Sequence, residues 1–225
     1  MQGYTPSMLL APRAEGTLVV DGLARLFGGK TVLDELSLRV EAGSVVQIVG
    51  QNGAGKTSLL RILAGTLTPT RGVVSVAGRP PGRGLAAFVP AGDRALYWRL
   101  TGRQELEFFS RIARRSRDRA AVAATVAEAA AALELNELLD QQIATMSTGQ
   151  RRRVMIARSL VGVPPVLLFD EPYADLDERA CELVASVASA WKGKGGTIVW
   201  ASPIPAGGPT ADTSFRLASG KLIRD

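Results

Sequence analysis

A glycine-rich turn early in the chain has the residue types and the spacing that bind phosphate. It reads GQNGAGKT from Gly50 to Thr57, between Ser44–Val49, predicted as a buried strand, and Ser58–Ala64, predicted as the start of a helix. Its glycines let backbone N–H groups point at an anion, and the positive end of the helix dipole attracts the same anion. We expect Lys56 to reach the β- and γ-phosphates of a nucleotide, and the Thr57 hydroxyl to take one coordination position of Mg²⁺.

Two later segments could bring more polar groups to a phosphate. Asp170 and Glu171 follow Val166–Phe169, a continuous apolar run typical of a buried parallel strand. In open α/β sheets, ligands bind beyond the carboxyl ends of such strands. The segment Ser147–Gly149 precedes a helical run, so it predicts a helix N-terminus that offers a second phosphate contact.

The elements that must position these residues alternate between strands and helices. Further strands are predicted at Thr17–Val20, Leu36–Val40, Val73–Val76 and Ala86–Val89, and from Thr197 onward. From Thr101 to about Ser159 the chain is rich in Ala, Leu, Glu and Arg, which predicts an inserted helical subdomain with helix starts at Thr101 and Asp118. A helix from Asp177 to Trp191 and a hairpin around Ser219–Gly220 complete the prediction.

The composition predicts a well-cored protein of the cytoplasm. The chain has 225 residues, of which 46% are hydrophobic, and no apolar run approaches the roughly 20 residues that cross a bilayer. Its single cysteine, Cys181, is interpreted as a packing residue, as are Trp191 and Trp200. The net charge of +6 favours an acidic partner, such as a nucleotide, a nucleic acid or an anionic membrane face.

Taken together and in order, these motifs resemble those of the ATP-binding subunits of ABC transporters. Gly50–Thr57 matches the Walker A motif, Ser147–Gln150 resembles the signature motif, Val166–Asp170 matches Walker B, and Ala174–Asp177 resembles the D-loop. The ordered set covers nearly the whole chain from about Leu18. The resemblance implies an α/β P-loop NTPase (RecA-like) fold, with a mixed sheet, an inserted helical subdomain and a small antiparallel β subdomain.

The resemblance also implies ATP and Mg²⁺ as cofactors and gives the site residues their roles. Thr57 and Asp170 would hold the metal, and Glu171 would polarise the attacking water as general base. The nucleotide-binding residues that it implies are Phe27, Asn52, Gly53, Gly55, Lys56, Thr57, Ser58, Ser147, Thr148 and Gly149. For Phe27, two interpretations stand: packing in the small sheet, or stacking on adenine, which the family's pattern favours.

Two subunits of the family pair head to tail, so that each ATP lies between one subunit's Walker A turn and the other subunit's signature segment. The implied partners are therefore a second ATPase subunit, identical or homologous, and integral membrane subunits that receive the motion. This implies a peripheral location on the inner face of the cell membrane.

The sequence departs from the family's pattern at two polar positions. There is no histidine in the chain, and Pro203 stands where the family places its switch histidine. Ala91 stands where the family keeps a glutamine that contacts Mg²⁺ and the attacking water, with Asp93 nearby as a possible substitute through a water molecule. Since loss of one polarising donor costs about 10²–10³ in rate, slow hydrolysis is expected.

The segment Leu96–Leu106, with the Ser-Thr-Gly form of the signature, resembles exporter ATPases that work with separate membrane subunits. Tyr97 and Trp98 are interpreted either as core aromatics or as a socket for a helix of the membrane subunit.

Two alternative functions are an ABC-type ATPase acting on ribosomes or nucleic acid, and a nucleotide-binding regulatory partner with little hydrolysis. Nucleic-acid work is disfavoured because the chain holds one nucleotide domain and no long coiled-coil insertion.

For domain organisation we expect a loose tail at residues 1–15, followed by one ATPase domain at residues 16–225. Within that domain, the helical subdomain at about 93–160 would separate the two halves of the P-loop core.

Overall fold

The structure is a computed structural model that describes residues 11–12, 16–82, 84–115, 117–203 and 210–225. The tail predicted for residues 1–15 falls outside the described residues, except for residues 11 and 12. No helix in the described ranges combines the length and the apolar character that a bilayer span requires.

The larger of the two sheets is mixed and has six strands in the order β5-β6-β7-β3-β8-β9. Every neighbouring pair from β5 to β8 is parallel, and only the last pair, β8 with β9, is antiparallel. The strands are β3 (Val45–Val49), β5 (Ala86–Val89), β6 (Val166–Asp170), β7 (Thr197–Ser202), β8 (Thr213–Ala218) and β9 (Lys221–Arg224). This sheet confirms the predicted α/β class and the terminal hairpin.

The smaller sheet is antiparallel, in the order β2-β1-β4, with β1 at Leu18–Phe27, β2 at Lys30–Val40 and β4 at Arg71–Val76. The predicted strands were too short, because β1 and β2 continue to the turn at Gly28 and Gly29, which both have positive φ. The pairing of β1 with β2 shifts register three times after Val20, and these irregularities break the period-2 pattern from which strands are predicted.

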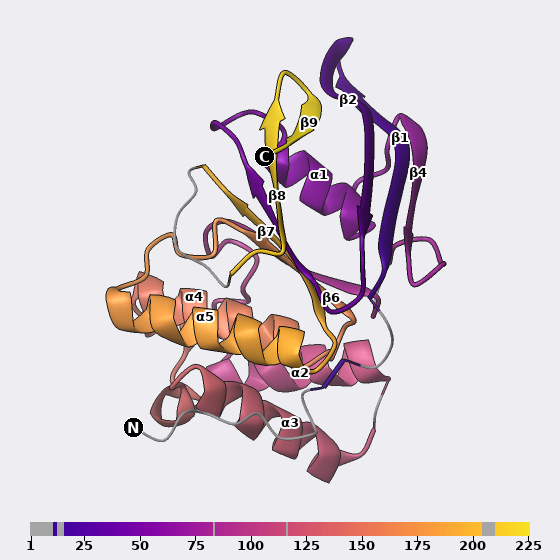
Figure 1. Cartoon of the computed structure of the whole chain (residues 1–225). Helices are drawn as coiled ribbons and strands as arrows, with labels where there is room; N and C mark the ends of the chain where they lie inside the picture. The colour runs from indigo at the N-terminus through magenta and orange to yellow at the C-terminus, as the bar shows by residue number, and fades with distance from the viewer. Residues whose placement is uncertain (1–10, 13–15, 83, 116, 204–209) are drawn as a thin grey trace.

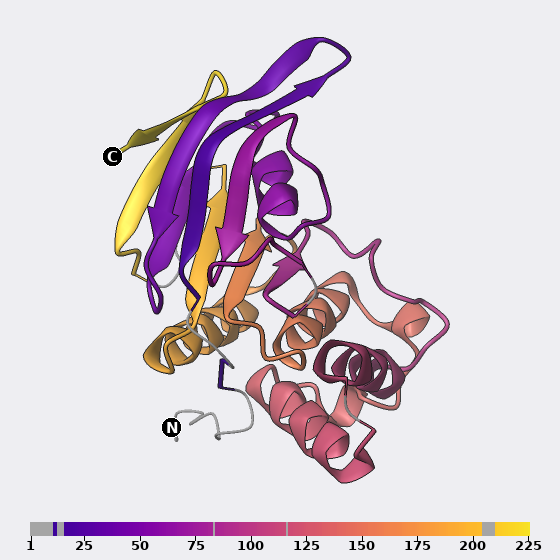
Figure 2. The same cartoon turned by 90° about the vertical axis from the view of Figure 1, so that its right-hand side faces the viewer.

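Helix α1 (Lys56–Leu63) lies between the two sheets, as Figures 1 and 2 show. It packs against β5, β6 and β7 on one side and against β4 on the other. Helices α4 (Thr148–Leu160) and α5 (Glu178–Gly193) cover the opposite face of the larger sheet. The start of α1 is thereby fixed at one edge of the larger sheet.

Helices α2 (Gly102–Arg114), α3 (Arg119–Ala132) and α4 follow one another between β5 and β6 and pack together, with two short 3₁₀ turns (Asn136–Leu138 and Ile143–Thr145) among them. The predicted helix starts are confirmed, since Thr101 caps α2, Asp118 caps α3 and Ser147 caps α4. Thr101 and Ser147 each form a capping box, with Gln104 and Gln150 respectively. Figure 2 shows these helices gathered at the end of the molecule away from the antiparallel sheet.

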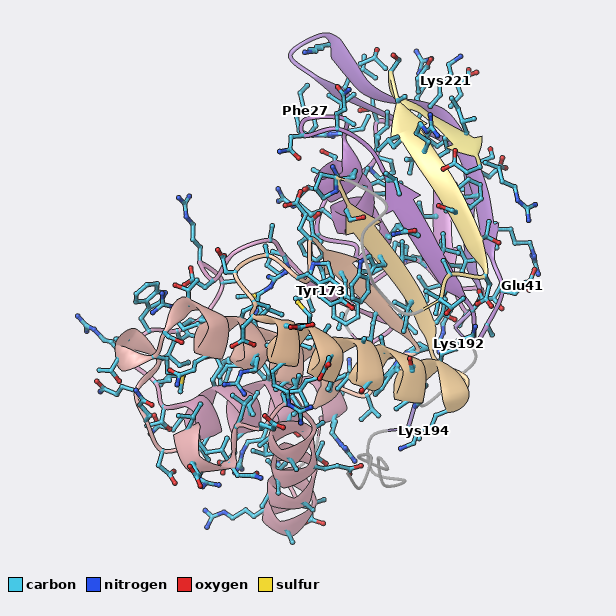
Figure 3. All side chains as sticks on the ribbon, turned by 60° about the vertical axis from the view of Figure 1, so that its left-hand side comes forward. Phe27, Glu41, Tyr173, Lys192, Lys194 and Lys221 are labelled. Carbon is cyan, nitrogen blue, oxygen red and sulfur yellow. The ribbon has the colours of Figure 1, made fainter. Side chains whose placement is uncertain are left out.

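Strand β6 is buried along its whole length because both faces of the sheet are covered. Leu168 packs in the cluster around α1, whereas Phe169 packs in the cluster beneath α4 and α5. The Phe169 ring lies 5.4 Å from the ring of Trp200, which confirms Trp200 as a packing residue. The ring of Tyr173 lies 4.9 Å from the same indole. Tyr173 packs against the cluster that includes Val184 and Val187 of α5 (Figure 3).

Substitution of Phe169 by Ala should lower the free energy of unfolding by about 3–5 kcal/mol, because it opens a cavity beneath the strand that ends in Asp170. Urea denaturation measures the change. The matched control is Val73→Ala in β4, whose side chain is 67% exposed and whose loss should cost less than about 1 kcal/mol. A loss below about 1 kcal/mol for Phe169→Ala would contradict this account of the core.

Candidate functional site

The turn after β3 adopts backbone conformations that need glycine. Gly53 has φ 82° and Gly55, which precedes the first residue of α1, has φ 106°. A Cβ at Gly55 would lie 2.9 Å from Cδ2 of Leu33, so a side chain there would both strain the backbone and clash with β2. No side chain caps α1, in contrast to α2 and α4, so its N-terminus is open to an anionic ligand.

Lys56 is held inside the turn that precedes it. Its side chain is 5% exposed, and its Nζ donates to the carbonyl oxygens of Gly50 at 2.6 Å and of Gln51 at 3.1 Å. These two bonds leave one ammonium hydrogen unassigned, since Nζ carries three. The ammonium group is therefore positioned over the turn and can offer a charged donor to a phosphate oxygen.

Thr57 and Asp170 meet although 113 residues separate them in the sequence. The Thr57 hydroxyl donates to Oδ2 of Asp170 at 2.6 Å. Asp170 is the last residue of β6, is 2% exposed, and lies near the backbone N–H of Ala91, which favours its ionised form. Burial raises the pKa of the Asp170 carboxyl, whereas the Thr57 bond and the charges of Lys56 and Arg152 oppose the shift.

The turn and the end of β6 enclose a cavity of about 360 Å³. Its lining brings together most of the predicted nucleotide-binding residues: Phe27, Asn52, Gly53, Gly55, Lys56, Thr57 and Ser58, together with Val32 and the predicted general base Glu171. A hydroxyl, an ammonium group and a carboxylate thus face one space at the carboxyl edge of the sheet.

Phe27 does not pack in the core of the small sheet. Its side chain is 44% exposed, and Figure 3 shows it on the antiparallel-sheet side of the molecule, away from α2 and α3. The guanidinium carbon of Arg25 lies 4.3 Å from the centre of its ring. The packing interpretation of Phe27 is therefore wrong, and its role toward adenine stays a prediction.

The residues Ser147–Gly149 lie outside that cavity. They form the start of α4, where a Cβ at Gly149 would lie 3.3 Å from the carbonyl oxygen of Asp175 in the predicted D-loop. Among the residues that line the cavity, none comes from this segment. One chain alone therefore does not bring the Walker A turn and the signature segment to the same space.

The two departures from the family's pattern also lie near this edge. Ala91 is exposed, and only its backbone N–H reaches Asp170. Pro203 is exposed and lines a second cavity, of about 740 Å³, on the side of the turn that faces Arg216–Gly220. Neither side chain has a hydrogen-bond donor, so both positions lack the group that the family's pattern supplies.

Arg152 is a residue at the site that our sequence reasoning missed. It is 1% exposed, and its guanidinium donates to the carbonyl oxygens of Asp170 and Glu171, both at 2.9 Å. The run of three arginines after the signature segment indicates only a charged helix face. The helical period could have indicated that Arg152 is buried, because Arg152 shares a face of α4 with the apolar residues Met155 and Ile156.

The side chains fit a Mg²⁺–phosphate group better than a metal held by protein alone. Within the described ranges, no group of three or more His, Cys, Asp or Glu side chains could hold a metal ion. Mg²⁺ is commonly held by one or two protein oxygens together with substrate phosphates and water, and Thr57 and Asp170 provide such a pair beside Lys56.

Comparison with protein families identifies one match that spans most of the chain. The family model described as "ABC transporter" matches residues 33–174, a range that begins in β2 and ends just after Glu171. It thus includes the turn at Gly50–Thr57, the signature segment and the end of β6.

Curated relatives include proteins named for import and for export. The chain is 36% identical over 169 residues to the sn-glycerol-3-phosphate import ATP-binding protein UgpC of Ruegeria pomeroyi, covering 72% of the chain and 47% of that relative. It therefore spans about half the length of that protein. It is 34% identical over 185 residues to the cytochrome c biogenesis ATP-binding export protein CcmA of Sphingopyxis alaskensis, covering 82% of the chain and 89% of that relative.

Solved structures share the fold. A structure of cbiO1 from Clostridium perfringens, described as part of the ABC transporter complex cbiONQ, superposes with a TM-score of 0.77 at 24% identity, covering 93% of this chain and 88% of that chain. At this identity the likeness concerns the fold, and it confirms the predicted P-loop NTPase architecture.

The raised pKa of Asp170 predicts how stability without nucleotide depends on pH. Burial raises the pKa of this carboxyl above its usual 3.8, so folding is favoured by its protonated form. This contribution to stability is fully present below pH 3.8 and is lost as pH rises through the folded-state pKa. Asp170→Asn should therefore raise the melting temperature at pH 7.5 in EDTA without nucleotide, and the difference from wild type should vanish near pH 3.5. A variant that melts below wild type at pH 7.5 would refute this electrostatic interpretation.

Proposed function

Since this chain belongs to the ABC transporter ATP-binding family, whose members are ATPases coupled to transport, we propose that it is the ATP-binding subunit of an ABC transporter. The observation that carries this proposal is the cavity at the carboxyl edge of the sheet. There Lys56, Thr57 and Glu171 face one space, and Asp170 is bonded to Thr57.

In this proposal, the triphosphate lies along the Walker A turn, and the adenine stacks on the exposed ring of Phe27. Lys56 exchanges its bonds to the carbonyl oxygens of Gly50 and Gln51 for phosphate oxygens. Thr57 and Asp170 would hold Mg²⁺, which when bound neutralises phosphate charge and orients the leaving group. Glu171 accepts the proton of the attacking water.

The site is completed by a second subunit. The capped start of α4 at Ser147, Thr148 and Gly149 lies outside the cavity of its own chain, so it is available to cover the nucleotide of a partner. ATP then holds two subunits together, and loss of the γ-phosphate contacts lets them separate. The second subunit is a copy of this chain or a homologous ATPase.

A second candidate function is a subunit that binds ATP, stabilises the closed pair and hydrolyses little. It is favoured by the side chains of Ala91 and Pro203, which offer no donor at positions where the family keeps glutamine and histidine. Lys56, Thr57 and Asp170, which would bind Mg–ATP, are in place. Both candidates therefore predict nucleotide binding, and they differ in turnover.

An exposed aromatic groove is the surface that we assign to the membrane subunit. Tyr97 is 54% exposed, Trp98 43% and Phe108 44%, so the interpretation of Tyr97 and Trp98 as core aromatics is wrong. Tyr97 and Phe108 line a cavity of about 410 Å³ between α2, α4 and β5, together with Phe109. The helix-in-groove mode of recognition suits such a surface, and it would place the subunit on the inner face of the cell membrane.

The direction of transport rests on the segment Leu96–Leu106 and on the Ser-Thr-Gly form of the signature, which favour export. The names of the relatives do not decide between the two directions, because they include an import protein and an export protein at comparable identity.

The rate of ATP hydrolysis tests the catalytic part of the proposal. Purified protein with Mg–ATP should turn over at least about 10²-fold more slowly than an ordinary member of the family, because the loss of one polarising side chain already costs about 10²–10³ in rate and two are missing. Glu171→Gln should lower the rate further, to background. Restoring the donors with Ala91→Gln and Pro203→His together should raise it. Turnover as fast as that of an ordinary member would contradict the proposal of slow hydrolysis.

Association with membrane subunits tests the groove. Tyr97→Ala combined with Phe108→Ala, which removes two rings that line the groove, should reduce the recovery of integral membrane subunits by about tenfold or more when the tagged protein is isolated from solubilised membranes, since aromatic anchors dominate such interfaces. Val73→Ala combined with Ile223→Ala removes two other exposed apolar side chains and should leave recovery unchanged. Equal recovery with both double variants would eliminate the groove as the docking surface.

A further inference from the structure

Arg152 makes many hydrogen bonds to backbone carbonyl groups, although it stands in a run of three arginines, a pattern typical of an exposed helix face. Five carbonyl oxygens lie within hydrogen-bond distance of its guanidinium: those of Pro90, Gly92, Asp170, Glu171 and Pro172. Arg152 is the fifth residue of α4, and its side chain is almost fully buried. A planar guanidinium carries five N–H donors in a rigid fork, so this set of acceptors suits arginine and no other side chain.

Three of the five carbonyls surround the predicted general base. Glu171 has φ 47°, a left-handed conformation that costs a residue with a side chain about 1–3 kcal/mol and persists only where the surroundings enforce it. Its N–H donates to Ala201 on β7 at 2.9 Å, and its carbonyl accepts from Arg152 at 2.9 Å. Arg152 and β7 thus hold the Glu171 backbone from both sides.

The other two carbonyls flank Ala91. Nη1 of Arg152 donates to Pro90 and, at 3.3 Å, to Gly92. The N–H of Ala91, in the same peptide unit as the Pro90 carbonyl, lies near the Asp170 carboxylate and opposes the rise in its pKa. One guanidinium therefore links the segment after β5 to the end of β6, and it orients the only group of Ala91 that can still reach the metal-binding carboxylate.

Electrostatics supports a role beyond packing. Burial lowers the pKa of the Arg152 guanidinium, and the carboxylates of Asp170, Asp175, Glu171 and Asp93 oppose this shift. In return, the buried charge of Arg152 favours the ionised form of the Asp170 carboxyl, against the burial that raises its pKa.

We propose that Arg152 is a positioning residue that fixes the backbone of Glu171 and the peptide of Ala91 relative to Asp170, and so sets the hydrolysis rate and not the affinity for ATP. This inference rests on the proposed function for its kinetic consequence. Its structural part, the immobilisation of two segments by one side chain, stands independently of any activity.

Two measurements on Arg152→Lys test this inference, with Arg153→Lys as the matched control. Arg153 is the next residue of α4 and also donates to carbonyls, those of Leu133 at 2.8 Å and Glu134 at 3.1 Å, which follow the end of α3. Lysine keeps the charge in both variants and loses the fork. Arg152→Gln, which keeps two donors without the charge, separates geometry from charge.

In hydrogen–deuterium exchange, Arg152→Lys should speed the exchange of the amide of Glu171, which is bonded to Ala201, about tenfold or more and leave Leu135 unchanged, whereas Arg153→Lys should leave Glu171 unchanged. In kinetics, kcat should fall about 10- to 100-fold for Arg152→Lys with KM and the dissociation constant for ATP within about threefold of wild type. Arg153→Lys should retain wild-type values.

Unchanged exchange at Glu171 in folded Arg152→Lys would overturn the inference, whatever the turnover. An equal loss of kcat in Arg153→Lys, or a loss of ATP affinity as large as the loss of kcat, would also overturn it, because either indicates a general structural role. If wild type hydrolysed no faster than Glu171→Gln, hydrolysis as the proposed function would fail, while the exchange measurement would still decide the role of Arg152.

Discussion

The hydrogen bond between Thr57 and Asp170 depends on nearly every element of the fold. Thr57 is the second residue of α1 and Asp170 is the last residue of β6, and strand β7 separates β6 from β3 in the sheet. They meet because parallel strands place their carboxyl ends along one edge, and because α1 packs across β5, β6 and β7 directly after the turn. Because β6 is buried on both faces, the Asp170 carboxylate is removed from water and packing fixes its position.

Local chemistry made much of this arrangement predictable from the sequence. The turn at Gly50–Thr57 needs glycine for its own backbone, and Thr101, Asp118 and Ser147 cap helices with their own side chains, so the evidence for each lies within a few residues. The apolar run before Asp170 marks a strand that is covered on both faces. Such features require no knowledge of distant contacts.

Features that depend on long-range packing could not be predicted in this way. The exposure of Phe27 and its contact with Arg25 depend on the irregular pairing of β1 with β2, which a period-2 pattern does not describe. The burial of Arg152 depends on two strand ends that lie 62 and 18 residues away in sequence, at Pro90 and Asp170. A charged residue is rarely buried unless its donors are satisfied, and only the folded chain shows that these carbonyls satisfy them.

We propose that this edge of the sheet binds ATP together with Mg²⁺. The most direct measurement is a calorimetric titration of ATP, with and without Mg²⁺, into wild type, Lys56→Ala and Thr57→Val. We predict that wild type binds ATP more tightly with Mg²⁺ than without it, that Thr57→Val loses this dependence on the metal, and that Lys56→Ala weakens binding by about tenfold or more. Equal affinity for wild type and Lys56→Ala, or no effect of Mg²⁺ on wild type, would mean that this edge of the sheet is not a Mg–ATP site.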